Sequence, residues 1–200
     1  MHRVREALVE VFIIFLVGGL IGAVLAVVSN LFVMGVQWFG QQREASDLLS
    51  FTLGDQSLSF SSVLFLWAAA AVVVFIKTGL GIRRWAGPAD SMYAAHQVHQ
   101  PLDIKTGFAS TLAAFASASG GASVGQYGPI VHFGATMGIW FKRFVSSRLS
   151  HEIYLGCGVA AAISAGFNAP IAGVIFAHEA ILRHFSVRAI APITVASVSA

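Results

Sequence analysis

The chain has 200 residues, of which 56% are hydrophobic and 10% are charged, and its mean hydropathy is +0.77. Soluble domains carry roughly a quarter charged residues, so this composition predicts an integral membrane protein. The net charge of +3 comes from 12 basic and 9 acidic residues scattered along the chain, which gives no reason to expect a nucleic acid partner. A single cysteine, Cys157, excludes an internal disulfide bond.

The first apolar stretch, from about residue 11 to residue 39, predicts an uncleaved transmembrane helix. No charged residue occurs between Glu10 and Arg43. Because the stretch exceeds the roughly 20 residues that cross a bilayer, the helix must tilt or extend past it. It also lacks the short apolar core and small-residue cleavage site of a secretory signal. The polar segment from Arg43 to Gln56 is then expected to form an external loop.

A second span is expected over residues 58–76, and it returns the chain to the side on which it started. Basic residues gather on that side, which the positive-inside tendency assigns to the cytoplasm. They are Arg3, Arg5, Lys77, Arg83, Arg84 and Lys105. We therefore expect a multi-pass protein of the plasma (inner) membrane with a cytoplasmic N-terminus.

The remaining segments are shorter or less apolar than full spans. Residues 87–105 are too polar to cross a membrane and predict a short re-entrant helix that begins near Pro88. Residues 106–119 are mostly Ala, Ser, Gly and Thr, and are expected to be surrounded by protein rather than lipid. Further helices are expected from Pro129 to about Phe144, at 154–166, at 171–182, and from about Ala189 onward.

A glycine-rich stretch, GGASVGQYGPIVHFGATMG at residues 120–138, is the most informative part of the sequence. Four glycines precede Pro129, and the letters after Pro129 are typical of a helix, so we expect an unwound loop that leads into a helix with proline at its first position. The free N–H groups and the dipole of such a helix start attract anions. Within a membrane, broken helices of this kind line a cavity.

Two motifs resemble the CLC family of chloride channels and chloride–proton antiporters. Residues 125–129, followed by Val131, Gly134, Ala135 and Gly138, are similar to the family signature in which a G-x-E-G-P loop opens a helix. Residues 160–179, which contain GFNAPIAG at 166–173, are similar to the family block A-x-F-N-A-P-x-A-G-x-x-F-x-x-E. The order and separation of the two motifs also agree with the family.

The resemblance implies an all-α, polytopic membrane fold with tilted and broken helices, built in the family from two inverted repeats. It covers the N-terminal half of such a subunit, so we expect residues 1–200 to form one transmembrane domain that corresponds to the first repeat and is truncated near residue 200. It further implies anion binding among helix N-termini at mid-membrane, chloride or a similar small monovalent anion as the transported species, and pairing of subunits into a homodimer.

The departures from the family pattern concern proton coupling. Tyr127 stands where the family has its gating glutamate, and a phenol stays neutral near pH 7 and offers a hydroxyl donor instead of a negative charge. Glu179 is followed by Ala180, whereas exchangers of the family have a second glutamate there. The resemblance therefore implies passive anion movement without protons. The alternatives are a proton-coupled antiporter whose relay uses another residue, such as Glu179 or His132, and a non-transporting membrane scaffold.

The candidate anion contacts and gate lie at the glycine-rich loop and the start of its helix. They are Gly125, Gln126, Tyr127, Gly128, Ile130 and Val131. A different role for Tyr127 is that of an interfacial anchor. His132, on the same helix, is most simply a polar group with its hydrogen bonds satisfied.

Further residues on the anion path are expected at Ser123, Pro88, Ser91 and Asn168. The family has a G-S-G-x-P loop on the cytoplasmic side, and residues 87–91 occupy its place: either Pro88 replaces the serine, or Ser91 substitutes for it after a small shift. Ser123 is equally consistent with packing or backbone bonding, and Asn168 with a cap of the helix that follows it. Glu179 and Arg183 are four residues apart in the favourable order, so a helix-end ion pair is the alternative to a relay role.

Enzymatic interpretations do not fit the sequence. His178 and Glu179 begin like the zinc motif H-E-x-x-H, but Leu182 stands at the position of the second histidine, so no metal site is expected. Ser123 is followed by Val124 rather than by the glycine that an intramembrane serine protease needs. We expect neither an enzyme nor a cofactor.

Overall fold

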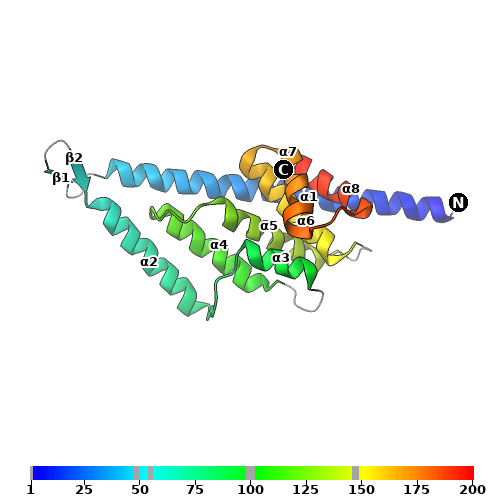
Figure 1. Ribbon diagram of the computed structural model, residues 1–200, viewed down its shortest axis with the longest axis horizontal. Coiled ribbons are helices and arrows are strands. Elements are labelled where there is room, and N and C mark those ends of the chain that lie inside the picture. Colours follow the sequence, from blue (N-terminus) through cyan, green and yellow to red (C-terminus); the bar gives the residue numbers. More distant parts are fainter. Residues whose placement is uncertain (1, 47–49, 54–55, 98–101, 146–148) are drawn as a thin grey trace.

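The computed structural model describes the chain except for residues 1, 47–49, 54–55, 98–101 and 146–148 (Figure 1). The described residues are almost entirely helical, which confirms the all-α class. The helices are α1 (His2–Ala45), α2 (Ser61–Gly79), α3 (Pro88–His96), α4 (Ile104–Ser119), α5 (Tyr127–Lys142), α6 (His151–Phe167), α7 (Pro170–Phe176), the π-helical turn η1 (Ala177–Leu182) and α8 (Val187–Val198).

One small element of another kind lies between α1 and α2. Strands β1 (Ser50–Leu53) and β2 (Gln56–Ser59) pair antiparallel, with Ser50 opposite Ser59 and Leu53 opposite Gln56. The segment at residues 43–56, which is expected to be an external loop, therefore contains strand β1 and the first residue of strand β2. The hairpin lies at one end of the molecule, where α1 ends and α2 begins (Figure 1).

Two helices, α1 and α2, are long and apolar enough to cross a membrane within the part of the chain that the structure describes. The 44 residues of α1 give a length of roughly 66 Å, about twice the hydrocarbon thickness of a bilayer, so this helix extends past the apolar layer or tilts within it. The most apolar window of α2 has none of its residues buried. Its outward side chains include Trp67 and Phe75, at 72% and 75% exposed, as expected for a surface that faces lipid or another protein.

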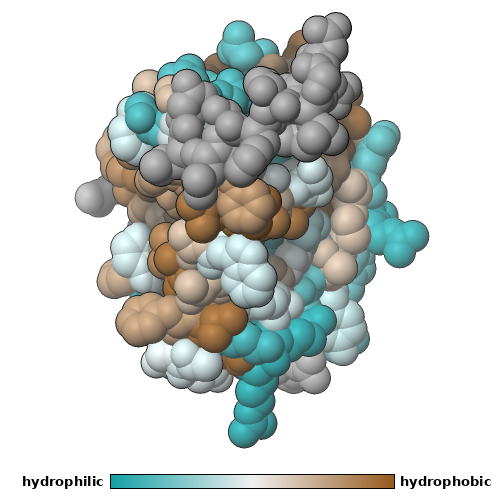
Figure 2. All heavy atoms as spheres, turned by 90° about the vertical axis from the view of Figure 1, so that its left-hand side faces the viewer, coloured by the Kyte–Doolittle hydropathy of each residue, from teal (hydrophilic) through white to brown (hydrophobic). Residues whose placement is uncertain are grey.

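The end of the molecule that carries the hairpin has a mixed surface. Figure 2 shows hydrophobic side chains over much of this end, with hydrophilic ones gathered mostly toward its edges.

The core is organised around α6. All residues from Ile153 to Ser164 are buried, and α6 packs against α1, α5, α7 and α8. A helix that is apolar on all sides is expected to be surrounded by other helices. Because α5 and α7 both pack on α6, this helix fixes where each of them begins.

Glycines allow α5 and α6 to cross at very short range. A Cβ atom on Gly138 would overlap the backbone carbonyl of Tyr154, and one on Gly158 would overlap the carbonyl of Gly134. Small residues at such crossings let the backbones approach closely, which is the usual way in which helices associate in lipid. The contact holds α5 rigidly against the buried core.

The small-residue helix α4 lies mainly among other helices, as expected from its composition. Its neighbours are α1, α2 and α5, and its buried residues include Gly107, Ala109 and Ser110, whereas Leu112 on the opposite side is 56% exposed. The prediction that protein surrounds this segment is therefore confirmed for one face. Asp103 caps its N-terminus by accepting hydrogen bonds from the backbone N–H groups of Lys105 and Thr106.

We expect Gly138→Ala to lower the free energy of unfolding by about 1–3 kcal/mol, because the added methyl group must push α5 away from α6. Thermal unfolding of the purified protein in detergent measures the effect. The matched control is Gly40→Ala in α1, where a Cβ would meet no atom within 4 Å. This control should be neutral or gain about 0.5–1 kcal/mol, since alanine favours a helix. Equal stability of the two variants would contradict the close crossing.

We expect Asp103→Ala to destabilise the protein by roughly 0.5–2 kcal/mol, the usual effect of losing an N-cap side chain. The hydrogen bond from Thr106 is the largest cause that lowers the pKa of Asp103 below its ordinary value of 3.8. A lowered pKa means that the contribution of Asp103 is present above about pH 4 and is lost as the pH falls further. Unfolding measured between pH 3 and pH 7 should show this acid loss in the parent and not in Asp103→Ala.

Candidate functional site

The glycine-rich loop between α4 and α5 is unwound, as predicted. Gly121 and Gly125 adopt φ angles of 98° and 71°, in the left-handed region that favours glycine. The guanidinium group of Arg43, at the end of α1, lies directly against Gly121. The path of the loop therefore depends on glycine at these two positions, and the cationic side chain of Arg43 lies beside it.

The helix that follows begins earlier than predicted. Gln126 is its N-cap and Tyr127 its first residue, so Pro129 occupies the third helical position and not the first. A proline is tolerated here because the first residues of a helix have no carbonyl partner for an N–H group. The first backbone bond runs from the N–H of Ile130 to the carbonyl of Gln126, at 3.4 Å.

The loop and helix start present a row of free donors. Among the described residues, the backbone N–H groups of residues 125–128 have no hydrogen-bond partner. Ile130 and Val131 differ, because both are buried and the Ile130 amide is used in the helix. Ser123 is exposed, and its hydroxyl group has no hydrogen bond within the described chain. The donors that can meet an anion are thus those of Gly125, Gln126, Tyr127 and Gly128.

The Tyr127 ring is held by the end of α6. It stacks on Phe167 with ring centroids 4.1 Å apart and an interplanar angle of 24°. Gly166 leaves the necessary room, since a Cβ there would come within 3.2 Å of the tyrosine ring. The Tyr127 side chain is 36% exposed, and its hydroxyl group has no hydrogen-bond partner in the described structure.

Asn168 caps a helix, but not the one that the sequence suggests. It ends α6 in the left-handed conformation, at φ 51° and ψ 43°, and its backbone N–H bonds to the carbonyl of Ser164. Ala169 is the N-cap of α7, so the prediction that Asn168 caps the following helix is wrong. Asparagine adopts the left-handed region more readily than other non-glycine residues, which explains this C-cap.

A second helix start lies beside the first. Pro88 is the first residue of α3, as predicted, and a Cβ on Gly128 would lie 3.6 Å from its Cγ atom. The N-terminus of α3 is capped by Asp90, whose carboxylate accepts the N–H of Gly87 at 2.8 Å and pairs with Arg84. The positive ends of two helix dipoles, those of α3 and α5, therefore meet near Gly128.

Ser91 and His132 join the two helices inside the protein. Both are buried, and the Ser91 Oγ atom lies 2.8 Å from His132 Nδ1. The Ser91 hydroxyl group is engaged by this bond, whereas the Nε2 atom of His132 is buried and has no partner in the described structure. The view of His132 as a fully satisfied polar group is therefore correct for only one of its two nitrogens.

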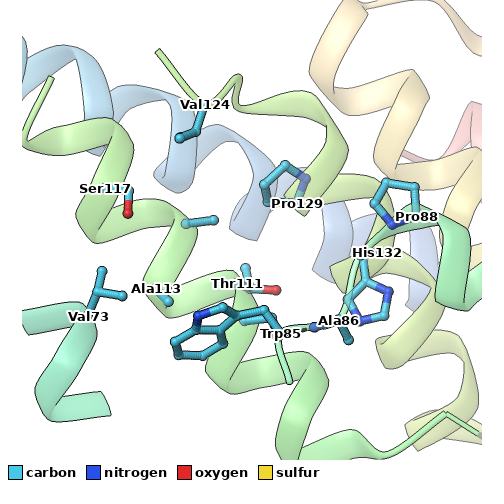
Figure 3. Close-up of a pocket in the computed structure, with 13 residues that line it drawn as sticks. Val73, Trp85, Ala86, Pro88, Thr111, Ala113, Ser117, Val124, Pro129 and His132 are labelled. Atoms are coloured by element: carbon cyan, nitrogen blue, oxygen red, sulfur yellow. Dashed lines mark hydrogen bonds between the residues drawn. The ribbon is translucent and has the colours of Figure 1, made fainter. Parts of the chain in front are cut away.

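A pocket of about 240 Å³ opens below the loop and is drawn in Figure 3. Val124 and Pro129 line it at the loop, Pro88 and His132 line one wall, and α4 and the segment at residues 85–87 supply most of the rest. None of its lining residues carries a formal charge. It is an apolar hollow with a few polar groups, as small-ligand sites usually are.

Glu179 and Arg183 do not form the expected ion pair. Both are exposed, and neither takes part in an ion pair of the described chain. Glu179 lies in the π-helical turn η1, and Arg183 ends it in the left-handed conformation with φ 56°. Four-residue spacing therefore does not bring the two side chains together here.

The metal interpretation also finds no support in the described part of the chain, where no three His, Cys, Asp or Glu side chains gather closely enough to hold an ion.

In this apolar and almost entirely helical protein, the starts of α3 and α5 lie close together, with free amide donors at residues 125–128 and the Asp90 carboxylate capping α3. Helix starts with free N–H groups are a feature of sites that bind anions. Residues 68–200 match the family model described as voltage gated chloride channel. The chain belongs to this family, which confirms the sequence resemblance and places it in a family of integral membrane proteins that are not enzymes.

Individual relatives agree with the family. The chain is 23% identical over 192 residues to the voltage-gated ClC-type chloride channel ClcB of Yersinia pseudotuberculosis, an alignment that covers 91% of this chain and 44% of the relative. It is 28% identical over 119 residues to a putative chloride channel protein ClcB-like of Ralstonia nicotianae, covering 57% and 28% of the two chains. A chloride channel protein of Torpedo marmorata is 32% identical over 99 residues, covering 46% and 12%. The chain thus spans less than half the length of these relatives.

Proposed function

We propose that the protein moves chloride or a similar small monovalent anion across the membrane, passively and without coupled protons. The observation that carries the proposal is the set of free N–H groups at residues 125–128, at the start of α5 and beside the start of α3. In a membrane such donors need a partner, and a partly dehydrated anion supplies one. The names of the relatives point to the same ion.

The surrounding charges support an anion. The Arg43 guanidinium lies against the loop at Gly121 and takes part in no ion pair of the described chain. A cation at the mouth of a low-dielectric path raises the local anion concentration. No carboxylate lines the pocket below the loop. Asp90, the acidic residue near the start of α3, is already paired with Arg84.

The proposal that protons are not coupled depends on two positions. Tyr127 offers a neutral ring at the helix start, and Ala180 cannot carry a proton. The stacking of Tyr127 on Phe167 supports the role of a steric gate, since it gives the ring a defined place beside the free amides. In the proposed arrangement the backbone of residues 125–128 binds the ion and the Tyr127 ring restricts access to it, while Ser123, Pro88, Ser91 and Asn168 border the path.

For the assembly we propose the arrangement that the family implies. The chain would form the first of two inverted repeats, two subunits would pair as a homodimer, and the N-terminus would lie in the cytoplasm of a cell whose plasma membrane holds the protein. The basic residues Lys77, Arg83 and Arg84 at the end of α2 support this orientation.

Liposomes that contain the protein expressed from its complete reading frame should release chloride with no linked proton movement. Chloride and proton fluxes are measured together, with a chloride electrode and a pH electrode. A fixed ratio of protons to chloride would contradict the uncoupled mechanism and favour a relay through another residue, such as Glu179. Normal assembly with no anion flux would favour the scaffold.

Tyr127→Ala should raise chloride efflux several-fold, because it removes the ring that restricts the loop, whereas Tyr127→Phe should stay near the parent rate, because the hydroxyl group has no partner. Tyr127→Glu should introduce block that is relieved as the pH falls, since a carboxylate competes with chloride until it is protonated. Efflux that is the same in all three variants and the parent would remove Tyr127 from the gate.

A further inference from the structure

A second pocket, of about 530 Å³, lies between the end of α2, helix α3 and the start of α4. Its volume is within the range of roughly 300–1,000 Å³ that is usual for ligand sites. No residue of the glycine-rich loop lines it. Its lining combines apolar residues with five charged ones, which are Arg83, Arg84, Lys105, Asp90 and Asp103.

The charges of this pocket leave two cations without an ion pair. The Asp90 carboxylate pairs with Arg84, and the Asp103 carboxylate caps α4 by accepting backbone N–H groups. Arg83 and Lys105 are exposed, and neither takes part in an ion pair of the described chain. Because three basic side chains stand against two acidic ones, the lining carries a net positive charge, and Arg83 and Lys105 are available to an anion.

The length of α2 relates the pocket to the membrane surface. Its 19 residues give a length of roughly 29 Å, which about matches the hydrocarbon layer of a bilayer. The helix starts beside the hairpin and ends away from it (Figure 1). A helix of this length that crosses the bilayer has its ends at the two membrane surfaces, so the pocket lies at headgroup level on the side opposite the hairpin.

Exposed apolar side chains lie next to the cationic part of the pocket. Phe75, near the end of α2, is 75% exposed, and Leu80, which lines the pocket directly after α2, is 39% exposed. Tyr93 of α3 also lines the pocket and is half exposed, as is usual for tyrosine at headgroup level. This combination matches a ligand that has a negatively charged head and apolar chains.

We propose that the pocket binds the phosphate headgroup of an anionic phospholipid, whose acyl chains lie along the exposed surface of α2. The planar guanidinium group of Arg83 can donate two hydrogen bonds to one phosphate, and Lys105 adds a second positive charge. A soluble phosphate offers the same charge but no apolar chains, so the exposed surface of α2 favours the lipid. The inference does not depend on which ion the protein transports.

The test titrates phosphatidylglycerol into the complete protein in detergent and measures the lipid-bound fraction by native mass spectrometry. Arg83→Gln and Lys105→Gln should each weaken binding about fivefold, and the double variant about 25-fold, which corresponds to about 1 kcal/mol for each basic residue. Arg83→Lys, which keeps the charge without the planar donor pair, should fall between the parent and Arg83→Gln.

The matched control is Lys77→Gln. Lys77 is an exposed basic residue in the last turn of α2, but it does not line the pocket, so its loss should leave lipid binding unchanged. Equal losses of affinity in Lys77→Gln, Arg83→Gln and Lys105→Gln would mean that the lipid is attracted to basic side chains in general, and would overturn the proposal. Unchanged binding in the double variant would overturn it as well.

A second measurement separates the lipid from a soluble phosphate. Phosphatidylglycerol should raise the unfolding temperature of the complete protein in detergent, because a ligand that binds the folded state stabilises it. Phosphatidylcholine, which has no net charge, and inorganic phosphate, which has no acyl chains, should give no comparable shift at the same concentration. An equal shift with inorganic phosphate would assign the pocket to soluble anions, and an equal shift with phosphatidylcholine would remove the role of charge. Either result would overturn the proposal.

Discussion

Unpaired backbone N–H groups at the start of α5 are the constraint on which the rest of the structure depends. In an apolar layer, a helix can be interrupted only where the freed N–H and C=O groups meet protein, water or an ion. The loop from Gly120 to Gln126 interrupts the helical chain between α4 and α5, with glycine at the two positions of positive φ that an ordinary residue would resist. The sequence thus breaks the helical backbone between α4 and α5 and leaves the N–H groups of residues 125–128 without a partner in the described chain.

The position of that break is set by packing on α6. The close crossing of α5 and α6 at Gly138 and Gly158 fixes the axis of α5, and the end of α6 supports the Tyr127 ring through Gly166 and Phe167. The left-handed cap at Asn168 then redirects the chain into α7. The buried helix α6 therefore positions both the first turn of α5 and the Tyr127 side chain of that turn.

Much of this arrangement was predictable from local sequence. The apolar spans, the unwound loop and the start of α3 at Pro88 follow from composition, glycine and proline chemistry. The start of α5 lies two residues before the one expected from Pro129, because a proline fits any of the first helical positions and does not mark a particular one. The hairpin was missed because its polar residues are equally typical of a loop.

Contacts between distant segments could not be read from local patterns. Ser91 and His132 are 41 residues apart, and their bond follows from the packing of α3 on α5. The residues around His132 in the sequence do not indicate that its Nδ1 atom is hydrogen-bonded and that its Nε2 atom has no partner in the described structure. Similarly, the spacing of Glu179 and Arg183 predicts a pair only in a regular α-helix, and the π-helical turn is set by the packing around Ala177, Ile181 and Leu182, which are all buried.

The strength of the Tyr127 contact bears on how a neutral gate can work. A stacked aromatic pair adds about 0.5–1.5 kcal/mol beyond the apolar area that it buries, and about 1.4 kcal/mol corresponds to a tenfold change in population. The contact with Phe167 therefore biases the ring toward one position without locking it there. In the proposed function, a ring held this weakly leaves the free amides by thermal motion, and no change of charge is needed to move it. The anion meets neutral donors along the path, so its passage requires no proton.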